Sequence, residues 1–199
     1  MMNLSVDIET LGTRVDAPIL SIGAVFFSPQ AGKLGEEFYA AIRPSSAALY
    51  GKVDIDTVQW WMKQDAAARD AAFSGTRELA EVLCCFAEWV KKHATNMSKL
   101  GVWANGPSFD ISILEYAYGK ALKSPPPWRY NAPRCVRTIN ALLGDRIEWK
   151  PMKGIQHNAL DDAKAQAERV MELWRLLLNE GAASVIPAVA QVPSDEGDL

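Results

Sequence analysis

The chain has 199 residues and a formal net charge of −3 at pH 7. This length supports one domain with a sizeable core, and the even spread of apolar residues gives no sign of a second domain. A protein that coats nucleic acid nonspecifically usually carries a strong basic excess, so the net charge argues against that class. No apolar run has membrane-spanning length and no signal peptide begins the sequence, so we expect a cytosolic (cytoplasmic) protein with no membrane partner.

The three cysteines predict reduced thiols. Cys84 and Cys85 are adjacent, Cys135 is separate, and none of them belongs to a C-x-x-C pair. An odd number of cysteines without that spacing fits neither a disulfide framework nor a zinc site. We therefore expect neither a structural disulfide nor a structural zinc ion.

Three segments near the start of the chain predict neighbouring β-strands. In Leu4–Ile8 apolar residues alternate with polar ones, so the carboxylates of Asp7 and Glu9 point to the same side. The apolar segments Ala17–Phe27 and Glu36–Ile42 predict the second and third strands. Their short connections make the three strands antiparallel neighbours.

The remainder of the chain predicts mainly helices. One buried strand is expected at Lys99–Ala104, and a Pro-rich loop at Ser124–Pro133. We expect a single domain over residues 1–181 and a mobile tail over residues 182–199. Helices are expected from Asp56, over Thr76–Lys92, from Ser108, over Arg134–Leu142 and over Asn158–Asn179.

Two of these helices turn a carboxylate toward the protein interior. Asp110 shares a helix face with Ile113 and Leu114, and a buried carboxylate costs free energy unless it binds a metal ion or is well hydrogen-bonded. The alternative is an Asp in the first helical turn that the helix dipole or backbone amides stabilise. On the last helix, the rotation per residue turns Asp161 toward solvent and Asp162 toward a cleft.

Four acids thus point from a strand and two helices toward one site: Asp7, Glu9, Asp110 and Asp162. Magnesium and manganese ions prefer oxygen ligands, and two such ions about 4 Å apart stabilise the attacking and leaving oxygens of a phosphoryl displacement. We therefore predict a site for two divalent ions, Mg2+ or Mn2+. His157 precedes Asp162 by five residues, although a lone histidine is often structural.

The motifs that carry these acids resemble those of a known enzyme family. "DIET" (7–10), "NGPSFD" (105–110) and "HNALDDA" (157–163), in this order and spacing, look like the three exonuclease motifs of the DnaQ-like 3′–5′ exonucleases. Four acids and a histidine place the resemblance in the subgroup written DEDDh. With "TVQWWMKQ" (57–64) and "VRTI" (136–139), the motifs resemble a branch that includes a mycobacterial exoribonuclease and the exonuclease A of T-even phages.

This resemblance, which covers most of the chain, implies a fold and a reaction. The fold is α/β, a ribonuclease-H-like mixed sheet of three antiparallel strands continued by parallel strands, with helices on both faces. The reaction is hydrolysis from a free 3′ end of DNA or RNA, single-stranded or as a 3′ overhang, which releases nucleoside 5′-monophosphates. By the same resemblance the four acids are metal ligands and His157 is the general base. Several relatives are dimers, so a homodimer stays open, but the sequence does not fix the oligomeric state.

The resemblance also points to substrate contacts. In related enzymes the residues just after the first two acids contact the terminal nucleotide, and residues of the second motif line its other side. Between residues 120 and 157 eight Lys or Arg stand against two acids, so this stretch would meet phosphates, although a charge run is often just a solvated face. The residues concerned are Thr10, Leu11, Asn105 and Phe109 for the terminal nucleotide, and Arg134 and Arg137 for the phosphates.

The helix predicted from Asp56 carries two adjacent tryptophans. Ile55 and Trp60 have the spacing of a hydrophobic staple around a capping box that starts at Asp56. Trp60 and Trp61 lie about 100° apart on a helix, so they cannot both face one way. We predict that Trp60 packs in the core and that Trp61, with Gln64 one turn on, stacks on a base. The alternative is that both tryptophans pack in the core.

Two other classes of function remain open at this stage. A catalytically silent nucleic-acid-binding module of the same fold is expected to have lost a ligand or the histidine, whereas all five residues are present. A ribonuclease-H-like endonuclease also uses acids on this sheet, but the histidine before the last Asp and the motif "NGPSFD" favour the exonuclease. A circular single strand separates these two enzymes, because an exonuclease leaves it intact.

Overall fold

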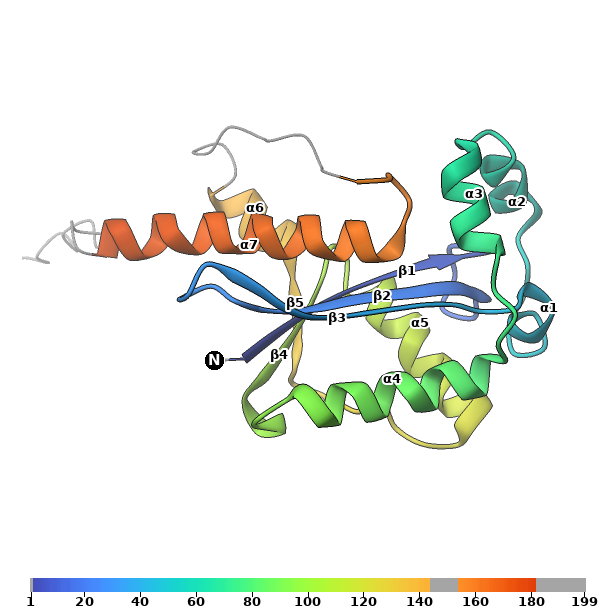
Figure 1. The fold of residues 1–199 in the computed structure, drawn as a ribbon, viewed down its shortest axis with the longest axis horizontal. Helices are drawn as coiled ribbons and strands as arrows, with labels where there is room; N and C mark the ends of the chain where they lie inside the picture. The colour runs from blue at the N-terminus through green and yellow to red at the C-terminus, as the bar shows by residue number, and fades with distance from the viewer. Residues whose placement is uncertain (1, 144–153, 182–199) are drawn as a thin grey trace, which may run out of the picture.

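The computed structural model describes residues 2–143 and 154–181, and its centre is a five-stranded mixed sheet (Figure 1). In spatial order the strands are β3 (Lys33–Ala41), β2 (Ile19–Ser28), β1 (Met2–Thr10), β4 (Leu100–Ala104) and β5 (Pro133–Cys135). β1, β2 and β3 pair antiparallel, whereas β4 and β5 extend the sheet in parallel from β1. This arrangement confirms the α/β fold that the sequence predicts.

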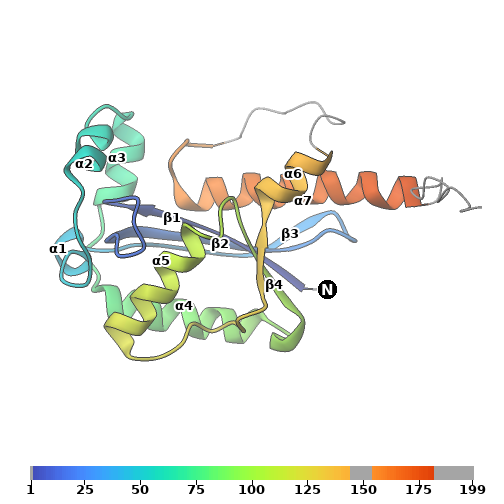
Figure 2. The same cartoon turned by 180° about the vertical axis from the view of Figure 1, so that it is seen from behind.

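Helices cover both faces of the sheet. The long helix α7 (Ala159–Gly181) lies across one face with α6 (Val136–Leu143) beside it. On the opposite face lie α4 (Leu79–His93) and α5 (Asp110–Ala117), as Figure 2 shows from behind. The expected layer order of helix, sheet and helix is therefore confirmed.

The alternation along β1 decides which side chains reach which layer. Leu4, Val6 and Ile8 are buried in the large core that α4 and α5 cover. Asp7 and Glu9 point to the other face, toward α7, because successive side chains of a strand alternate. One strand thus supplies both the core of one layer and two carboxylates for the opposite layer.

Gly23 lets α7 approach the sheet closely at the level of these carboxylates. It is the partner of Asp7 in the antiparallel pairing of β1 and β2. A Cβ atom at Gly23 would overlap the backbone of Ala159, the first residue of α7. The absence of a side chain therefore allows the first turns of α7 to lie directly over β1 and β2.

Several short elements differ from the sequence prediction. α4 begins at Leu79 rather than at Thr76, because Arg77 pairs with Ile42 and the N–H of Leu79 donates to the Ser46 hydroxyl at 3.0 Å. The sequence does not predict the strand β5, because it has only three residues and starts with a proline. Since β5 includes Arg134 and Cys135, α6 begins two residues later than expected. The other helices are α1 (Pro44–Ala47), α2 (Ile55–Trp61), α3 (Ala66–Phe73), a 3₁₀ turn at Met97–Lys99 and a π-helical turn at Tyr118–Leu122.

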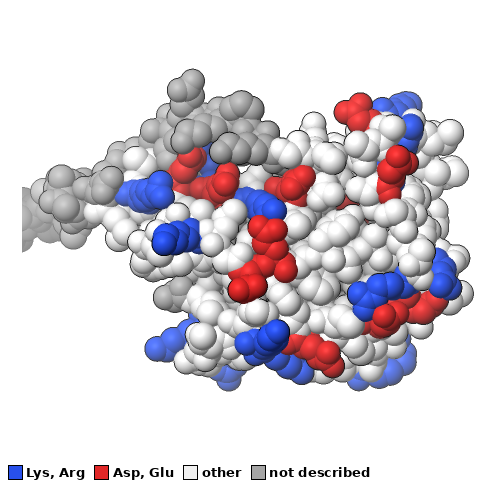
Figure 3. All heavy atoms as spheres, in the orientation of Figure 1, with Lys and Arg blue, Asp and Glu red and all other residues white. Residues whose placement is uncertain are grey.

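Charged side chains are mixed on the face that Figure 3 shows. The described Lys and Arg side chains lie there among Asp and Glu rather than in a separate basic area. Part of the basic stretch (144–153) and the tail predicted to be mobile (182–199) lie outside the described residues. No helix of the described ranges combines the length and the apolar character that a membrane crossing needs.

Candidate active site

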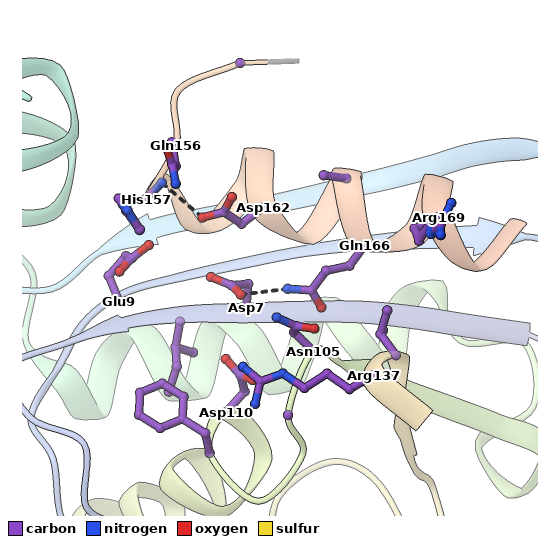
Figure 4. Close-up of a pocket in the computed structure, with 16 residues that line it drawn as sticks. Asp7, Glu9, Asn105, Asp110, Arg137, Gln156, His157, Asp162, Gln166 and Arg169 are labelled. Atoms are coloured by element: carbon purple, nitrogen blue, oxygen red, sulfur yellow. Dashed lines mark hydrogen bonds between the residues drawn. The ribbon is translucent and has the colours of Figure 1, made fainter. Parts of the chain in front are cut away.

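A cavity of about 780 Å³ opens between α7 and the ends of β1 and β4 (Figure 4). Strand β1, the turn between β4 and α5, helix α6, helix α7 and the loop that enters α7 all contribute to its wall. The five residues predicted as metal ligands and general base all line it: Asp7, Glu9, Asp110, His157 and Asp162. Segments up to 155 residues apart in the sequence therefore meet at one place, as the motif pattern predicts.

Burial raises the pKa of all four acids, and repulsion among them adds to the rise for Asp7 and Glu9. Burial raises the pKa of Asp7 well above its ordinary value, and the charges of Asp110, Glu9 and Asp162 add to this rise. Burial, with the charges of Asp162 and Asp110, raises the pKa of Glu9 to about 9. Burial also raises the pKa values of Asp110 and Asp162, each to about 6. Without a cation the four carboxyl groups are therefore not all ionised near neutral pH, whereas a bound cation favours their charged forms.

The donor set fits a divalent ion that prefers oxygen. All four acids offer carboxylate oxygens. A carboxylate oxygen of Glu9, a carboxylate oxygen of Asp162 and a ring nitrogen of His157 all lie within 4.8 Å of one another. Backbone groups also hold two of these carboxylates. Asp110 on α5 is held by Gly106 and Ile8, and Asp162 on α7 is held by His157. The backbone group of Asp110 itself, at the start of α5, also holds its carboxylate, so the backbone stabilisation considered for Asp110 is present beside its place in the cavity.

His157 sits at the cavity edge in an unusual backbone conformation. Its φ of 63° lies in the left-handed region, and its N–H donates to Oδ2 of Asp162 at 3.1 Å. The imidazole meets the indole of Trp60 edge to face, with the ring centroids 4.8 Å apart. Burial lowers the pKa of His157, which favours the neutral ring that is able to accept a proton.

The two adjacent acids of α7 separate as the helical rotation predicts. Asp162 lines the cavity, whereas Asp161 does not belong to its wall. Oδ2 of Asp161 instead accepts a hydrogen bond from the N–H of Ile155 at 2.9 Å, in the loop that enters α7. The Asn158 side chain accepts from the N–H groups of Leu160 and Asp161, and so caps the first turn.

The prediction for the two tryptophans is wrong, because their positions are exchanged. Trp61 is only 2% exposed, and its Nε1–H donates to the carbonyl oxygen of Thr10 at 2.9 Å. Trp60 is 40% exposed and contacts His157. The helix starts at Ile55 with Asp54 as its N-cap, rather than at the capping box expected at Asp56. Ile55 and Trp60 therefore do not occupy the positions of a hydrophobic staple, and Trp60 is not packed in the core.

The predicted substrate contacts divide into two groups. Asn105, Phe109 and Arg137 line the cavity, and the charge of Arg137 acts to lower the pKa of Asp110. Thr10, Leu11 and Gln64 do not line it; Thr10 and Leu11 are buried, and Gln64 donates to the carbonyl oxygen of Trp60. The guanidinium of Arg134 donates to three backbone carbonyls, those of Asn131, Ala132 and Pro133, and also lies outside the cavity wall.

Several wall residues have no counterpart in the sequence prediction. The most informative is Gln166, whose amide donates to Asp7 at 2.7 Å. It lies one helical turn after Asp162, so the i, i+4 spacing on the last helix is the signal that points to it. The others are Ile8, Gly106, Val136, Gly154, Gln156, Ala165 and Arg169.

Solved structures of several nucleases share this fold. The nuclease domain of 3′hExo, a DEDDh family member bound to rAMP, is 14% identical, covers 89% of this chain and 92% of its own, and has a TM-score of 0.62. The zinc-bound E. coli ExoI–ssDNA complex is 16% identical over 90% of this chain but 43% of its own, with a TM-score of 0.61. Exonuclease X with 5′ overhanging duplex DNA is 15% identical over 87% and 92%, with a TM-score of 0.55.

The fold and the five converging residues define a DnaQ-like 3′–5′ exonuclease of the DEDDh type. More narrowly, the chain belongs to the Rv2179c-like 3′–5′ exoribonuclease domain family, whose model matches residues 2–174. No curated protein sequence matches the chain.

Proposed function

We propose that this chain removes nucleotides one at a time from the free 3′ end of a nucleic acid and releases nucleoside 5′-monophosphates. The observation that carries this proposal is the convergence of four carboxylates and one imidazole on a single open cavity. Membership of an exoribonuclease domain family supports the direction of the reaction and its class. Cytosolic location stays a prediction from the sequence, and a homodimer stays an open possibility.

We infer that Asp7, Glu9, Asp110 and Asp162 hold two divalent ions, Mg2+ or Mn2+. Oxygen donors are the ligands that these ions prefer, and a bound cation favours the charged form of carboxylates whose pKa values burial raises and, for Asp7 and Glu9, mutual repulsion raises further. When bound, two such ions orient and acidify the attacking water and stabilise the oxygen that leaves. The protein's own part is to hold the four carboxylates on β1, α5 and α7.

His157 takes the proton of the attacking water. Its neutral imidazole stands beside Glu9 and Asp162, and its backbone bond to Asp162 fixes the loop that carries it. Arg137 offers a cation to the phosphate, and Phe109 offers a ring to the terminal nucleotide. Trp60 replaces Trp61 as the ring that stacks on a base, because it is the exposed one.

We propose single-stranded RNA as the preferred substrate. The matching family is described as exoribonuclease, and the related 3′hExo domain binds rAMP. ExoI and exonuclease X are bound to DNA, so the fold itself serves both sugars. A 3′ overhang presents the same kind of end as a free single strand and is expected to be degraded as well.

The test is a digestion of matched RNA and DNA oligonucleotides that carry a label at the 5′ end. We expect a ladder that shortens from the 3′ side, faster for RNA, and slowed by a 3′-terminal phosphate. A closed circular strand of the same sequence is the control and is expected to stay intact. Cleavage of the circle would reassign the chain to an endonuclease, and binding without any ladder would reassign it to a silent module.

A further inference from the structure

Gln166 lies inside the cluster of acids although it carries no charge. It is one helical turn after Asp162 on α7, and its side chain lines the same cavity (Figure 4). Its Nε2–H donates to Oδ1 of Asp7 at 2.7 Å, which is short for an N–H···O hydrogen bond. One of the two oxygens of Asp7 is thus occupied by a neutral donor from α7.

A neutral donor suits the surroundings of Asp7. The carboxylate is buried and crowded by Asp110, Glu9 and Asp162, and the hydrogen bond from Gln166 favours its charged form. A lysine in this place would neutralise Asp7 and repel a cation, and a fifth acid would increase the repulsion among the carboxylates. An amide stabilises the charged form of Asp7 without changing the net charge that draws a cation into the cavity.

The other end of the Gln166 amide is not satisfied. Its Oε1 is buried and has no hydrogen-bond partner among the described residues. A buried acceptor without a partner costs free energy, so an apolar side chain of similar length would suit packing better. The orientation of the amide is therefore set by Asp7, and its presence is explained by the site rather than by stability.

We infer that Gln166 is a positioning residue that holds the carboxylate of Asp7 in one orientation, with its second oxygen left for a divalent ion. Gln166 acts through Asp7 and needs no contact with the substrate. This inference rests on the proposed function, because it assigns to Asp7 a ligand role. It predicts a loss of metal affinity without a loss of stability when the amide is removed.

The experiment compares Gln166→Met and Gln166→Asn with wild type and with Lys164→Met. Lys164 lies on the same helix outside the cavity, where it pairs with Glu37 at 2.7 Å, so it is a matched control. Calorimetric titration with Mn2+ and no nucleic acid should show affinity reduced roughly 10- to 100-fold in both Gln166 variants and unchanged in the control. Asn keeps an amide but is one methylene too short to reach Asp7.

Thermal unfolding in chelator supplies the second measurement. Gln166→Met should melt close to wild type, because the loss of the unsatisfied oxygen offsets the loss of the hydrogen bond to Asp7. Wild-type Mn2+ affinity in either Gln166 variant, or a lower melting temperature of Gln166→Met with unchanged affinity, would make Gln166 an ordinary structural residue and overturn the inference. Oligonucleotide degradation by wild type tests the proposed function separately, so the two failures are distinguishable.

Discussion

The indole of Trp60 meets the imidazole of His157 at an interplanar angle of 81°, with the ring centroids 4.8 Å apart. An exposed aromatic ring therefore stands directly beside the residue that we propose as the general base. The next residue, Trp61, is buried under α3 and hydrogen-bonded to Thr10. This difference gives two neighbouring residues of the same type opposite expected effects when they are mutated.

Trp60→Ala should weaken substrate binding and leave the fold intact. Stacking of a base on an aromatic ring contributes about 1–3 kcal/mol, so KM for an oligonucleotide should rise roughly 5- to 150-fold. The rise should vanish for a substrate whose 3′-terminal nucleotides lack bases, which separates stacking from other effects. An equal rise for the abasic substrate would show that Trp60 acts only through His157.

Trp61→Ala is the companion variant, with the opposite expectation. Removal of a large buried aromatic side chain typically costs about 3–5 kcal/mol of unfolding free energy. Chemical denaturation should therefore show a large loss of stability for Trp61→Ala and little change for Trp60→Ala. Equal stabilities of the two variants would contradict the burial of Trp61.

Asp161 and Asp162 offer a second matched pair. Asp162→Asn should lose nearly all turnover, because the residue lines the cavity among the other acids. Asp161→Asn should keep most of it, since an amide oxygen still accepts the hydrogen bond from Ile155. Single-turnover digestion of a labelled RNA measures both, and a more active Asp162→Asn would show that Asp161 is the ligand.

The parts of the fold and site that follow from local periodicity are predictable from the sequence. The alternation along β1 puts Asp7 and Glu9 on one face, and the rotation along α7 separates Asp161 from Asp162. Both arguments need only the geometry of one element. They succeed because these two elements are long and regular.

The errors arise where a neighbouring segment decides the outcome. A cap at Asp54 and the cover from α3 determine which tryptophan is buried, and neither is readable from the spacing of the two tryptophans. The i, i+4 spacing from Asp162 points to Gln166 as a residue of the cavity wall. Its hydrogen bond to Asp7 joins residues 159 positions apart, so no local pattern predicts that bond. The strand β5 is too short for periodicity to indicate it.

The metal-free protein should lose stability as pH rises. Glu9, Asp110 and Asp162 have raised pKa values, about 9, 6 and 6, so each binds a proton more tightly in the folded state than in the unfolded chain. Their contribution is fully present below the unfolded values near 4 and is lost as pH rises toward 9.

Thermal unfolding in chelator at several pH values between about 4 and 9 measures this loss. Added Mg2+ or Mn2+ should flatten the profile, because bound cations stabilise the ionised carboxylates, and should be required for activity. Glu9→Gln should also flatten it in chelator. Full activity in excess chelator would contradict the proposal that the four acids hold two divalent ions. A melting temperature that rises with pH in chelator would contradict the raised pKa values.

His157→Ala tests the general base. The variant should keep Mn2+ binding and strand binding near wild type, since His157 is not among the proposed ligands, yet lower kcat by roughly 10²- to 10⁴-fold. Burial lowers the pKa of His157 below its ordinary value of about 6.5, so wild-type kcat should fall only as pH drops through that lower value, where the protonated ring can no longer accept a proton. In the Ala variant this acid limb should weaken or move.

His93→Ala, at the end of α4, is the matched control and should keep the wild-type rate and profile. Near-normal kcat with an unchanged acid limb in His157→Ala would leave the histidine a structural role in the loop and assign proton transfer to another group.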